Sequence, residues 1–295
     1  METIDQFVNV FFEQEKKNLL DNFPGITLDI LKREFFEFGG ANYSSKAEFY
    51  SAPKWWPKKH PNTVFFDQIK KGIPLQYITK KSFFYKYSFS THPDVFIPRY
   101  ETELLVEMGI KELEKLSQRL ESTPKVLDCG TGTGIIIISL MEIPFEGIAY
   151  DLNPQAISLA KRNYFNLRFN FPTAKPIRFI NKNFFEDDGQ KFHLIISNPP
   201  YIKKNEGKKS VHHQVINFEP ELALFIDDEK YNSWFDDFLN KTYLKLENGG
   251  IFLMEGHEDH LKNIEKQAKK IGFEDIIIVK DLTGRDRFLK ARKNG

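Results

Sequence analysis

Three glycines alternate with two threonines in residues 130–134, after a short predicted strand at 125–128 and before an apolar run at 135–141. This order predicts a strand, a tight loop and a helix, and glycine lets the loop approach a ligand where a Cβ atom would collide. No Lys-Ser or Lys-Thr follows, so the loop is not a phosphate-binding P-loop. Its G-x-G-x-G spacing also differs from the dinucleotide pattern G-x-G-x-x-G. The loop favours S-adenosylmethionine, which has no pyrophosphate; a plain strand-turn-helix is the alternative for this segment alone.

An acidic residue, Asp151, ends the second predicted strand at 147–151. A bound nucleoside presents its ribose hydroxyls at the carboxyl end of that strand, and a carboxylate accepts hydrogen bonds from both. The alternative is a helix cap ahead of Asn153-Pro154. Because the glycine loop and Asp151 indicate the same ligand, together they predict a nucleoside site.

The segment Asn198-Pro199-Pro200-Tyr201 follows another apolar strand, at 194–197. Ligands of open α/β sheets bind at the carboxyl ends of strands. Two prolines fix φ and lack N–H donors, so the carbonyls of Asn198 and Pro199 can face a substrate. The Asn198 side chain offers an acceptor and a donor, and Tyr201 offers a flat face. This combination suits a planar amide or an amino-substituted base; prolines that simply end a strand are the alternative.

Together with the glycine loop, this NPPY segment resembles methyltransferases that modify planar amino nitrogens, namely adenine-N6 enzymes and protein-glutamine enzymes. Further segments resemble the HemK/PrmC family, the release-factor glutamine methyltransferases. They are residues 74–78 (PLQYI), 97–103 (IPRYETE, like the family's PRxETE), 218–220 with 222–224 (FEP and LAL), and 280–287 with the pattern D-x-x-G-R-x-R. The resemblance extends from about residue 73 to residue 292, with the motifs in order.

The resemblance implies an α/β fold: a doubly wound, mostly parallel, seven-stranded Rossmann-like class I methyltransferase sheet with a small N-terminal helical domain. It implies methyl transfer from S-adenosylmethionine to the side-chain amide nitrogen of the glutamine in the Gly-Gly-Gln motif of class I peptide chain release factors. No metal is implied.

The motifs and the resemblance together assign roles to individual residues. The residues expected to contact the cofactor are Asp128, Gly130, Thr131, Gly132, Thr133, Gly134, Asp151, Asn183, Phe184 and Asn198. The expected catalytic residues are Asn198, Pro199, Pro200 and Tyr201, and the expected substrate contacts are these four with Arg99 and Glu219.

Three residues depart from the family pattern. Lys80 stands where the family usually has glycine, and Glu221 stands where it usually has a basic residue. Asn183 replaces an acidic residue that usually precedes an aromatic one, which leaves the neighbouring Phe184 as the side chain expected to stack on adenine.

Strands and helices alternate through the part of the chain that carries these motifs. Strands are expected at 125–128, 147–151, 177–180, 194–197, 250–254, 276–279 and 288–291, and helices at 101–120, 153–167, 231–246 and 262–270. Short connections between them predict a parallel sheet covered by helices on both faces. Only a short turn at Gly284 separates the last two strands, so these should pair antiparallel.

The first 70 residues are expected to be helical, with apolar residues near 3.6-residue spacing. Gly39-Gly40 should break the second helical run, and a proline-rich loop with Pro53, Pro57 and Pro61 should follow. Residues 75–96 are aromatic and alternating, which predicts a β-hairpin. The expected domains are a substrate-recognition domain at 1–72, a hairpin linker at 73–97 and a cofactor-binding domain at 98–295.

Composition limits the class of protein further. The 295 residues are 41% hydrophobic and 28% charged, with a formal net charge of +1, as in ordinary globular proteins and without the basic excess of nucleic-acid binders. The single cysteine, Cys129, excludes an intramolecular disulfide framework. We therefore expect a reduced, cytoplasmic protein without a membrane or a direct nucleic-acid partner. The alternatives are an adenine-N6 methyltransferase acting on DNA or RNA, and a catalytically silent adaptor that retains the fold.

Overall fold

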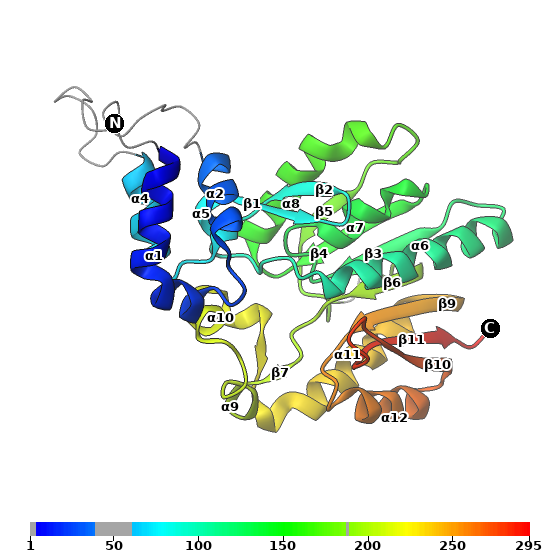
Figure 1. Ribbon diagram of the computed structural model, residues 1–295. Helices are drawn as coiled ribbons and strands as arrows, with labels where there is room; N and C mark the ends of the chain where they lie inside the picture. The colour runs from blue at the N-terminus through cyan, green and yellow to red at the C-terminus, as the bar shows by residue number, and fades with distance from the viewer. Residues whose placement is uncertain (1–3, 39–60, 187–188) are drawn as a thin grey trace. The chain divides into compact units, whose positions relative to one another are not determined.

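The computed structural model describes residues 4–38, 61–186 and 189–295 (Figure 1). The chain forms two compact units, one made of Met1–Lys81 with His212–Phe218 and the other of Ser82–Val211 with Glu219–Gly295. The first is helical and the second contains the main sheet. No helix within the described ranges is both long and apolar enough to cross a membrane.

The helical unit has a core of apolar and aromatic side chains. Val8 and Phe11 are buried on one face of the first helix, at the spacing that predicted this helix, and the Phe35 and Phe66 rings stack with centroids 5.0 Å apart. Thr27 caps the second helix by accepting a hydrogen bond from the Ile30 N–H (3.2 Å). The helices are α1 (Ile4–Asn22), α2 (Leu28–Glu37), α4 (Pro61–Lys70), α5 (Leu75–Thr79) and α10 (His213–Phe218).

Two parts of this region bear on the expectations from sequence. The break at Gly39-Gly40 and the loop with Pro53 and Pro57 lie outside the described residues, whereas Pro61 begins α4. The expected domain boundary is residue 72, but the helical unit reaches Lys81 and includes α10, far along the chain. Within this unit, Gln214 Nε2 donates to the Gly72 carbonyl (2.8 Å).

The expectation of an alternating pattern from residue 75 is wrong for its first part, because residues 75–79 form α5. Tyr77 and Ile78 are buried there, and Ile78 joins the core of the helical unit. The hairpin follows, with strands β1 (Lys81–Phe84) and β2 (Tyr87–Ser90). The expected hairpin is confirmed, but its alternation differs: Phe84 and Phe89 are fully buried, whereas Phe83 is 61% exposed.

The second unit contains a seven-stranded sheet in the order β10-β11-β9-β6-β3-β4-β5. The expected antiparallel pairing of the last two strands is confirmed: β11 pairs antiparallel with both β10 and β9, while the inner pairs are parallel. The strands are β3 (Lys125–Cys129), β4 (Glu146–Asp151), β5 (Arg178–Asn181), β6 (Phe192–Ser197), β9 (Leu246–Glu255), β10 (Phe273–Lys280) and β11 (Asp286–Lys293).

Helices cover both faces of this sheet, as expected for a doubly wound fold. The α-helices are α6 (Glu101–Arg119), α7 (Ile135–Ser139), α8 (Pro154–Leu167), α9 (Lys204–Gly207), α11 (Tyr231–Lys245) and α12 (Leu261–Ile271). The short elements are the 3-10 turns η2 (Leu140–Glu142), η3 (Arg168–Asn170), η4 (Glu221–Ala223) and η5 (Asp228–Lys230), and the paired strands β7 (Ile202–Lys203) and β8 (Phe225–Ile226).

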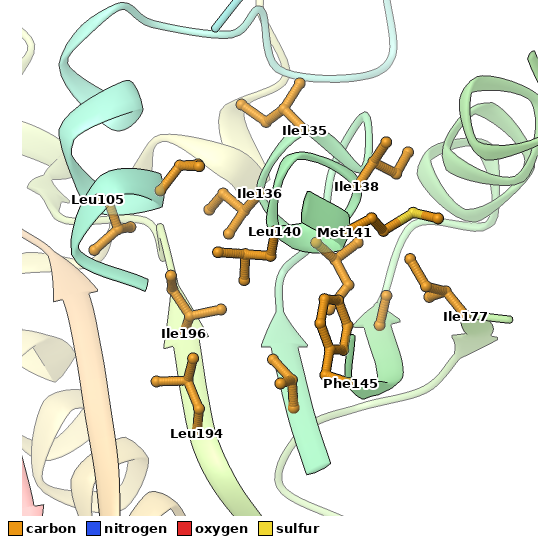
Figure 2. Close-up of a cluster of buried hydrophobic side chains, with 14 of the residues drawn as sticks. Leu105, Ile135, Ile136, Ile138, Leu140, Met141, Phe145, Ile177, Leu194 and Ile196 are labelled. Atoms are coloured by element: carbon orange, nitrogen blue, oxygen red, sulfur yellow. The ribbon is translucent and has the colours of Figure 1, made fainter. Parts of the chain in front are cut away.

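Alternate residues of each central strand enter different hydrophobic clusters. Leu194 and Ile196 of β6 pack with side chains of α6, α7 and α8, and Figure 2 shows Leu105 and Leu140 beside them. Ile195, between them, packs with α11 and α12. Because both faces are buried, these strands are mostly apolar, which explains why short apolar runs located them in the sequence.

Candidate active site

The glycine loop leaves β3 and enters α7, and two of its glycines meet different needs. Gly132 has a φ of +55°, and an added Cβ would meet nothing closer than Val95 Cγ1 at 4.0 Å, on a face that lines a cavity. Gly134 has a φ of +83°, and its Cβ would lie 3.1 Å from Ala160 Cβ in α8. Gly132 therefore leaves room for a ligand, whereas Gly134 permits close packing of the loop on a helix.

Asp151 ends β4 and faces the same cavity. Its two carboxylate oxygens accept hydrogen bonds from the backbone N–H groups of Gly132 and Asn153, each at 2.8 Å. Partial burial raises its pKa, and these two hydrogen bonds oppose that rise. Each oxygen keeps further acceptor capacity for hydroxyl donors. The helix-cap alternative is excluded by position, since Asn153 caps α8 by accepting from Gln155 N (2.9 Å).

Asp128 lies beneath the loop and does not line the cavity. It is fully buried, and Thr131 Oγ1 donates to its Oδ2 at 2.6 Å. Burial raises the pKa of Asp128 to about 7, while the Thr131 hydrogen bond acts in the opposite direction. Its contact with a residue of the loop fits a role in holding the loop.

The NPPY segment begins directly after β6. Ser197 Oγ donates to the Cys129 carbonyl (2.7 Å), which ties the ends of β6 and β3 together. Asn198 lines the cavity, and its Nδ2 donates to Thr102 Oγ1 (3.1 Å). Tyr201 does not line the cavity; its hydroxyl donates to Glu255 Oε1 (3.0 Å), and burial raises its pKa well above the usual value.

Thr102 and Glu255 were not identified from the sequence. Thr102 is the second residue of α6, Glu255 is the last residue of β9, and the two residues are 0% and 1% exposed. Thr102 Oγ1 donates to Glu255 Oε2 at 2.7 Å. The signal was available, because Glu255 is an acidic residue at the carboxyl end of an apolar strand, as Asp151 is.

Arg99 and Glu219 form an ion pair, with Arg99 Nη2 2.5 Å from Glu219 Oε1. Glu219 is buried and also accepts from the Ile97 N–H (3.2 Å), and the Arg99 guanidinium lies 4.5 Å from the centre of the Phe96 ring. Arg99 lines the cavity and Glu219 does not. Glu219 thus holds Arg99 and the backbone of the preceding segment in place.

Aromatic side chains form one wall of the cavity. Phe184 is 6% exposed and packs on Phe238 of α11 at 5.1 Å between centroids, and Trp234 stacks on the same ring at 5.0 Å. Asn183 lines the cavity, and its Oδ1 accepts from the Phe185 N–H (3.0 Å). Trp234 and Phe238 were missed in the sequence, although their spacing of four residues places them on one helix face.

The cavity has a volume of about 220 Å³ and lies entirely within the second unit. Asp128, Gly134, Tyr201 and Glu219 support its walls without lining it. The other sequence-predicted site residues line it together: Arg99, Gly130, Thr131, Gly132, Thr133, Asp151, Asn183, Phe184, Asn198, Pro199 and Pro200.

Sheet topology explains this convergence. From β3 the chain proceeds to β4 and β5 on one side, and β6 lies on the other side of β3, so β3 lies at a switch point in strand order. A crevice forms there at the carboxyl ends of the strands. The residues fit S-adenosylmethionine, since the loop is open at Gly132, Asp151 can accept from hydroxyls, and flat apolar side chains line one wall. In the part of the chain that is described, no cluster of three or more His, Cys, Asp or Glu side chains is arranged for a metal ion.

These features define a class of protein. The last strand is inserted antiparallel next to the otherwise parallel strands, and the cavity lies at the end of the central strand β3. The fold and site are those of a class I S-adenosylmethionine-dependent methyltransferase.

Comparisons with known proteins specify the family. The family model for the methyltransferase small domain matches residues 87–222. The release factor glutamine methyltransferase of Flavobacterium psychrophilum is 35% identical over 76% of this chain and 77% of its own length. Those of Bacteroides thetaiotaomicron and Shewanella oneidensis are 30% and 33% identical, each over 79% of this chain and 80% of the relative. The chain belongs to the release factor glutamine methyltransferase family.

Proposed function

We propose that this protein transfers a methyl group from S-adenosylmethionine to the side-chain amide nitrogen of the glutamine in the Gly-Gly-Gln motif of class I peptide chain release factors. One observation carries the proposal. Asn198 and its two prolines line the same cavity as Gly132 and Asp151, so an amide-binding group and a nucleoside-binding group share one space. Membership of the family supports the same substrate.

The residues divide the work in a way that follows from their contacts. Gly132 and Asp151 would hold the nucleoside, with Phe184 beside the base. When bound, S-adenosylmethionine supplies an electrophilic methyl group. The Asn198 nitrogen is hydrogen-bonded to Thr102, so its oxygen is the group left to accept from a substrate.

The amide nitrogen of glutamine is a poor nucleophile, because its lone pair is delocalised into the carbonyl group. The protein's main task is therefore alignment. We assign Asn198 Oδ1 and the Pro199 carbonyl as acceptors for the two amide protons, which orients the nitrogen and stabilises positive charge as it develops. No strong base is required, because the nitrogen becomes strongly acidic once it is methylated.

The partner and the cellular location are part of the proposal. The helical unit, which contributes no cavity-lining residue, would bind the rest of the release factor. The net charge of +1 supports a protein partner and argues against direct contact with nucleic acid or anionic membrane. A reducing cytoplasm suits a chain with one free cysteine.

Transfer of labelled methyl groups tests this function. The full chain is incubated with labelled S-adenosylmethionine and either a class I release factor, the same factor with the Gly-Gly-Gln glutamine changed to alanine, or an adenine-containing oligonucleotide. We expect label only on the unmodified factor. Label on the oligonucleotide would support the adenine-N6 alternative, and no label on any acceptor despite cofactor binding would support a silent adaptor.

A further inference from the structure

We propose that Thr102 and Glu255 are positioning residues that determine which end of the Asn198 side-chain amide faces the cavity. This inference rests on the proposed function, because the amide matters only if Asn198 receives the substrate. Both residues are buried in the second unit, and they come from α6 and from the end of β9.

The direction of each hydrogen bond follows from the chemistry of the groups. Thr102 Oγ1 donates its hydroxyl proton to Glu255 Oε2 at 2.7 Å, where the carboxyl oxygen is the acceptor. The Thr102 oxygen is then left as an acceptor, and it lies 3.1 Å from Asn198 Nδ2. An Asn198 amide turned by 180° would set its oxygen against the Thr102 oxygen with no proton between them. The chain from Glu255 through Thr102 therefore fixes Asn198 Oδ1 as the free group.

The Glu255 carboxyl group also fixes the other polar side chain of the NPPY segment, Tyr201. Tyr201 donates its hydroxyl proton to Glu255 Oε1 at 3.0 Å, so each carboxylate oxygen is bound to a different hydroxyl group. Burial raises the pKa of Glu255, and the hydrogen bonds from Thr102 and Tyr201, with the charge of Arg287 in β11, oppose that rise. One buried carboxyl group thus orients both polar side chains of the NPPY segment.

Loss of the Glu255 carboxyl group should therefore change the orientation of the Asn198 side chain. In Glu255→Met, which is similar in length but cannot accept, the Thr102 hydroxyl is free to donate to Asn198 Oδ1, and both amide orientations become populated. In Thr102→Val the link is removed. Thr102→Ser keeps the hydroxyl. Thr242→Val is the matched control, because Thr242 is a fully buried threonine whose hydroxyl donates within its own helix, α11, to the Phe238 carbonyl (2.7 Å).

The first measurement is the single-turnover rate of methylation, with both S-adenosylmethionine and the release factor at saturating concentrations. The second is the affinity for S-adenosylhomocysteine, measured by calorimetry. We expect Thr102→Val and Glu255→Met each to lower the rate about 10- to 100-fold, the range seen when a supporting hydrogen bond of a site is lost. Cofactor affinity should stay within about threefold. The double variant should be no slower than either single variant, because the two residues act as one device. Thr102→Ser should recover most of the rate.

A second readout does not depend on activity. The 15N–1H signal of the Asn198 carboxamide is assigned by its loss in Asn198→Asp. Its protons should be protected from exchange with water in the unmodified protein and in Thr102→Ser. They should lose that protection in Thr102→Val and Glu255→Met. If these spectra behave so but no release factor is methylated, the proposed function fails and the positioning role stands. Additive losses of rate, slowing equal to that of Thr242→Val, or an unchanged Asn198 signal would each overturn the positioning role.

Discussion

Gly132 combines a left-handed backbone with an open face toward the cavity, and both properties can be tested by one substitution. A valine there would place its side chain in the space available to the nucleoside, with a φ of +55° that disfavours any Cβ. We expect Gly132→Val to abolish S-adenosylhomocysteine binding in calorimetry, in a protein that remains folded.

The matched control is Gly284→Val. Gly284 has a φ of +87° and no atom within 4 Å of an added Cβ, but it lies in the β10–β11 turn away from the cavity. Both variants carry backbone strain of about 1–2 kcal/mol, so only the position relative to the cavity differs. Undiminished binding in a folded Gly132→Val protein would contradict the assignment of the nucleoside site.

Asn198 is expected to act mainly in the transition state, since its free oxygen accepts from a nitrogen that becomes positive during transfer. Asn198→Ala should lower the single-turnover rate about 100- to 1000-fold, the usual cost of one preorganised polar contact, or roughly 3–4 kcal/mol. Cofactor affinity should change little. Asn240→Ala serves as the control, because Asn240 is an exposed asparagine on α11.

The reverse pattern would be informative. If Asn198→Ala destroyed cofactor affinity while the rate at saturating cofactor survived, Asn198 would be a cofactor ligand. The alignment of the substrate would then fall to the Pro199 carbonyl and other backbone groups.

Lys80 is the C-cap that directly follows α5, and its φ of +58° is the left-handed conformation that glycine usually adopts at helix ends. The family usually has glycine at this position, so lysine here should carry backbone strain that glycine would avoid. A non-glycine residue there loses about 1–2 kcal/mol, and glycine returns part of that through a more flexible unfolded chain. We expect Lys80→Gly to raise the free energy of unfolding by roughly 0.5–1 kcal/mol.

Chemical denaturation measures this effect. Lys81→Gly, one residue later in β1, should instead destabilise the protein, because glycine weakens a strand. A loss of stability in Lys80→Gly comparable to that in Lys81→Gly would show that the helix end tolerates lysine without strain.

The turn between β10 and β11 is closed by Asp281. Its Oδ1 accepts from the Thr283 hydroxyl (2.7 Å) and from the N–H groups of Thr283 (2.8 Å) and Arg285 (3.1 Å). These hydrogen bonds, the Thr283 hydroxyl first, lower the pKa of Asp281 from 3.8 to about 2. Because the folded pKa is the lower one, the stabilisation is complete above about pH 4 and is lost as the pH falls toward 2.

Asp281→Asn removes this charge and should lower the free energy of unfolding by roughly 1–2 kcal/mol at pH 7. The difference from the unmodified protein should shrink as denaturation is repeated between pH 5 and pH 2. Asp286→Asn, which loses one ion pair with an exposed lysine, should cost less. A difference that stays constant down to pH 2 would show that the Asp281 charge has no part in the turn.

At the scale of the whole molecule, the cavity and the helical unit are separate: every lining residue falls between Asp94 and Phe238 and belongs to the second unit. A chain that begins at Ser82 should therefore bind S-adenosylhomocysteine with nearly full affinity and methylate a short Gly-Gly-Gln peptide at close to the full rate. It should methylate an intact release factor at least about 10-fold more slowly, equivalent to the loss of roughly 1.4 kcal/mol of binding.

The same assay on the full chain is the comparison, and calorimetry confirms that the truncated protein is folded. In the truncated chain, the segment His212–Phe218 would lose partners such as Gly72. The effect of that loss on turnover is measured separately with a full-length variant, Gln214→Ala, which removes only the 2.8 Å hydrogen bond to Gly72. Unchanged turnover of the intact factor by the truncated chain would exclude partner binding by the helical unit.

The sequence by itself was enough for the local elements of the sheet, and eleven of the site residues predicted from it line the cavity. Strands buried on both faces are mostly apolar, so short apolar runs marked them, and the residue at the carboxyl end of such a strand lies at the ligand edge. That rule identified Asp151 and Asn198. The alternating pattern, in contrast, gave a wrong prediction for residues 75–79. These residues form a helix that packs into the core of the helical unit.

Only the tertiary structure decided which distant residues meet. The pairing of Thr102 with Glu255 joins residues 153 positions apart, and that of Gln214 with Gly72 joins residues 142 apart. Neither pair leaves a periodic signal, because each depends on strand order and on the path of a connecting segment. The sequence determined which groups are present at the ends of the strands. The fold determined that Asn198 Nδ2 is bound to Thr102 and that its oxygen is left free, because hydrogen-bond partners are set by three-dimensional distance and not by order along the chain.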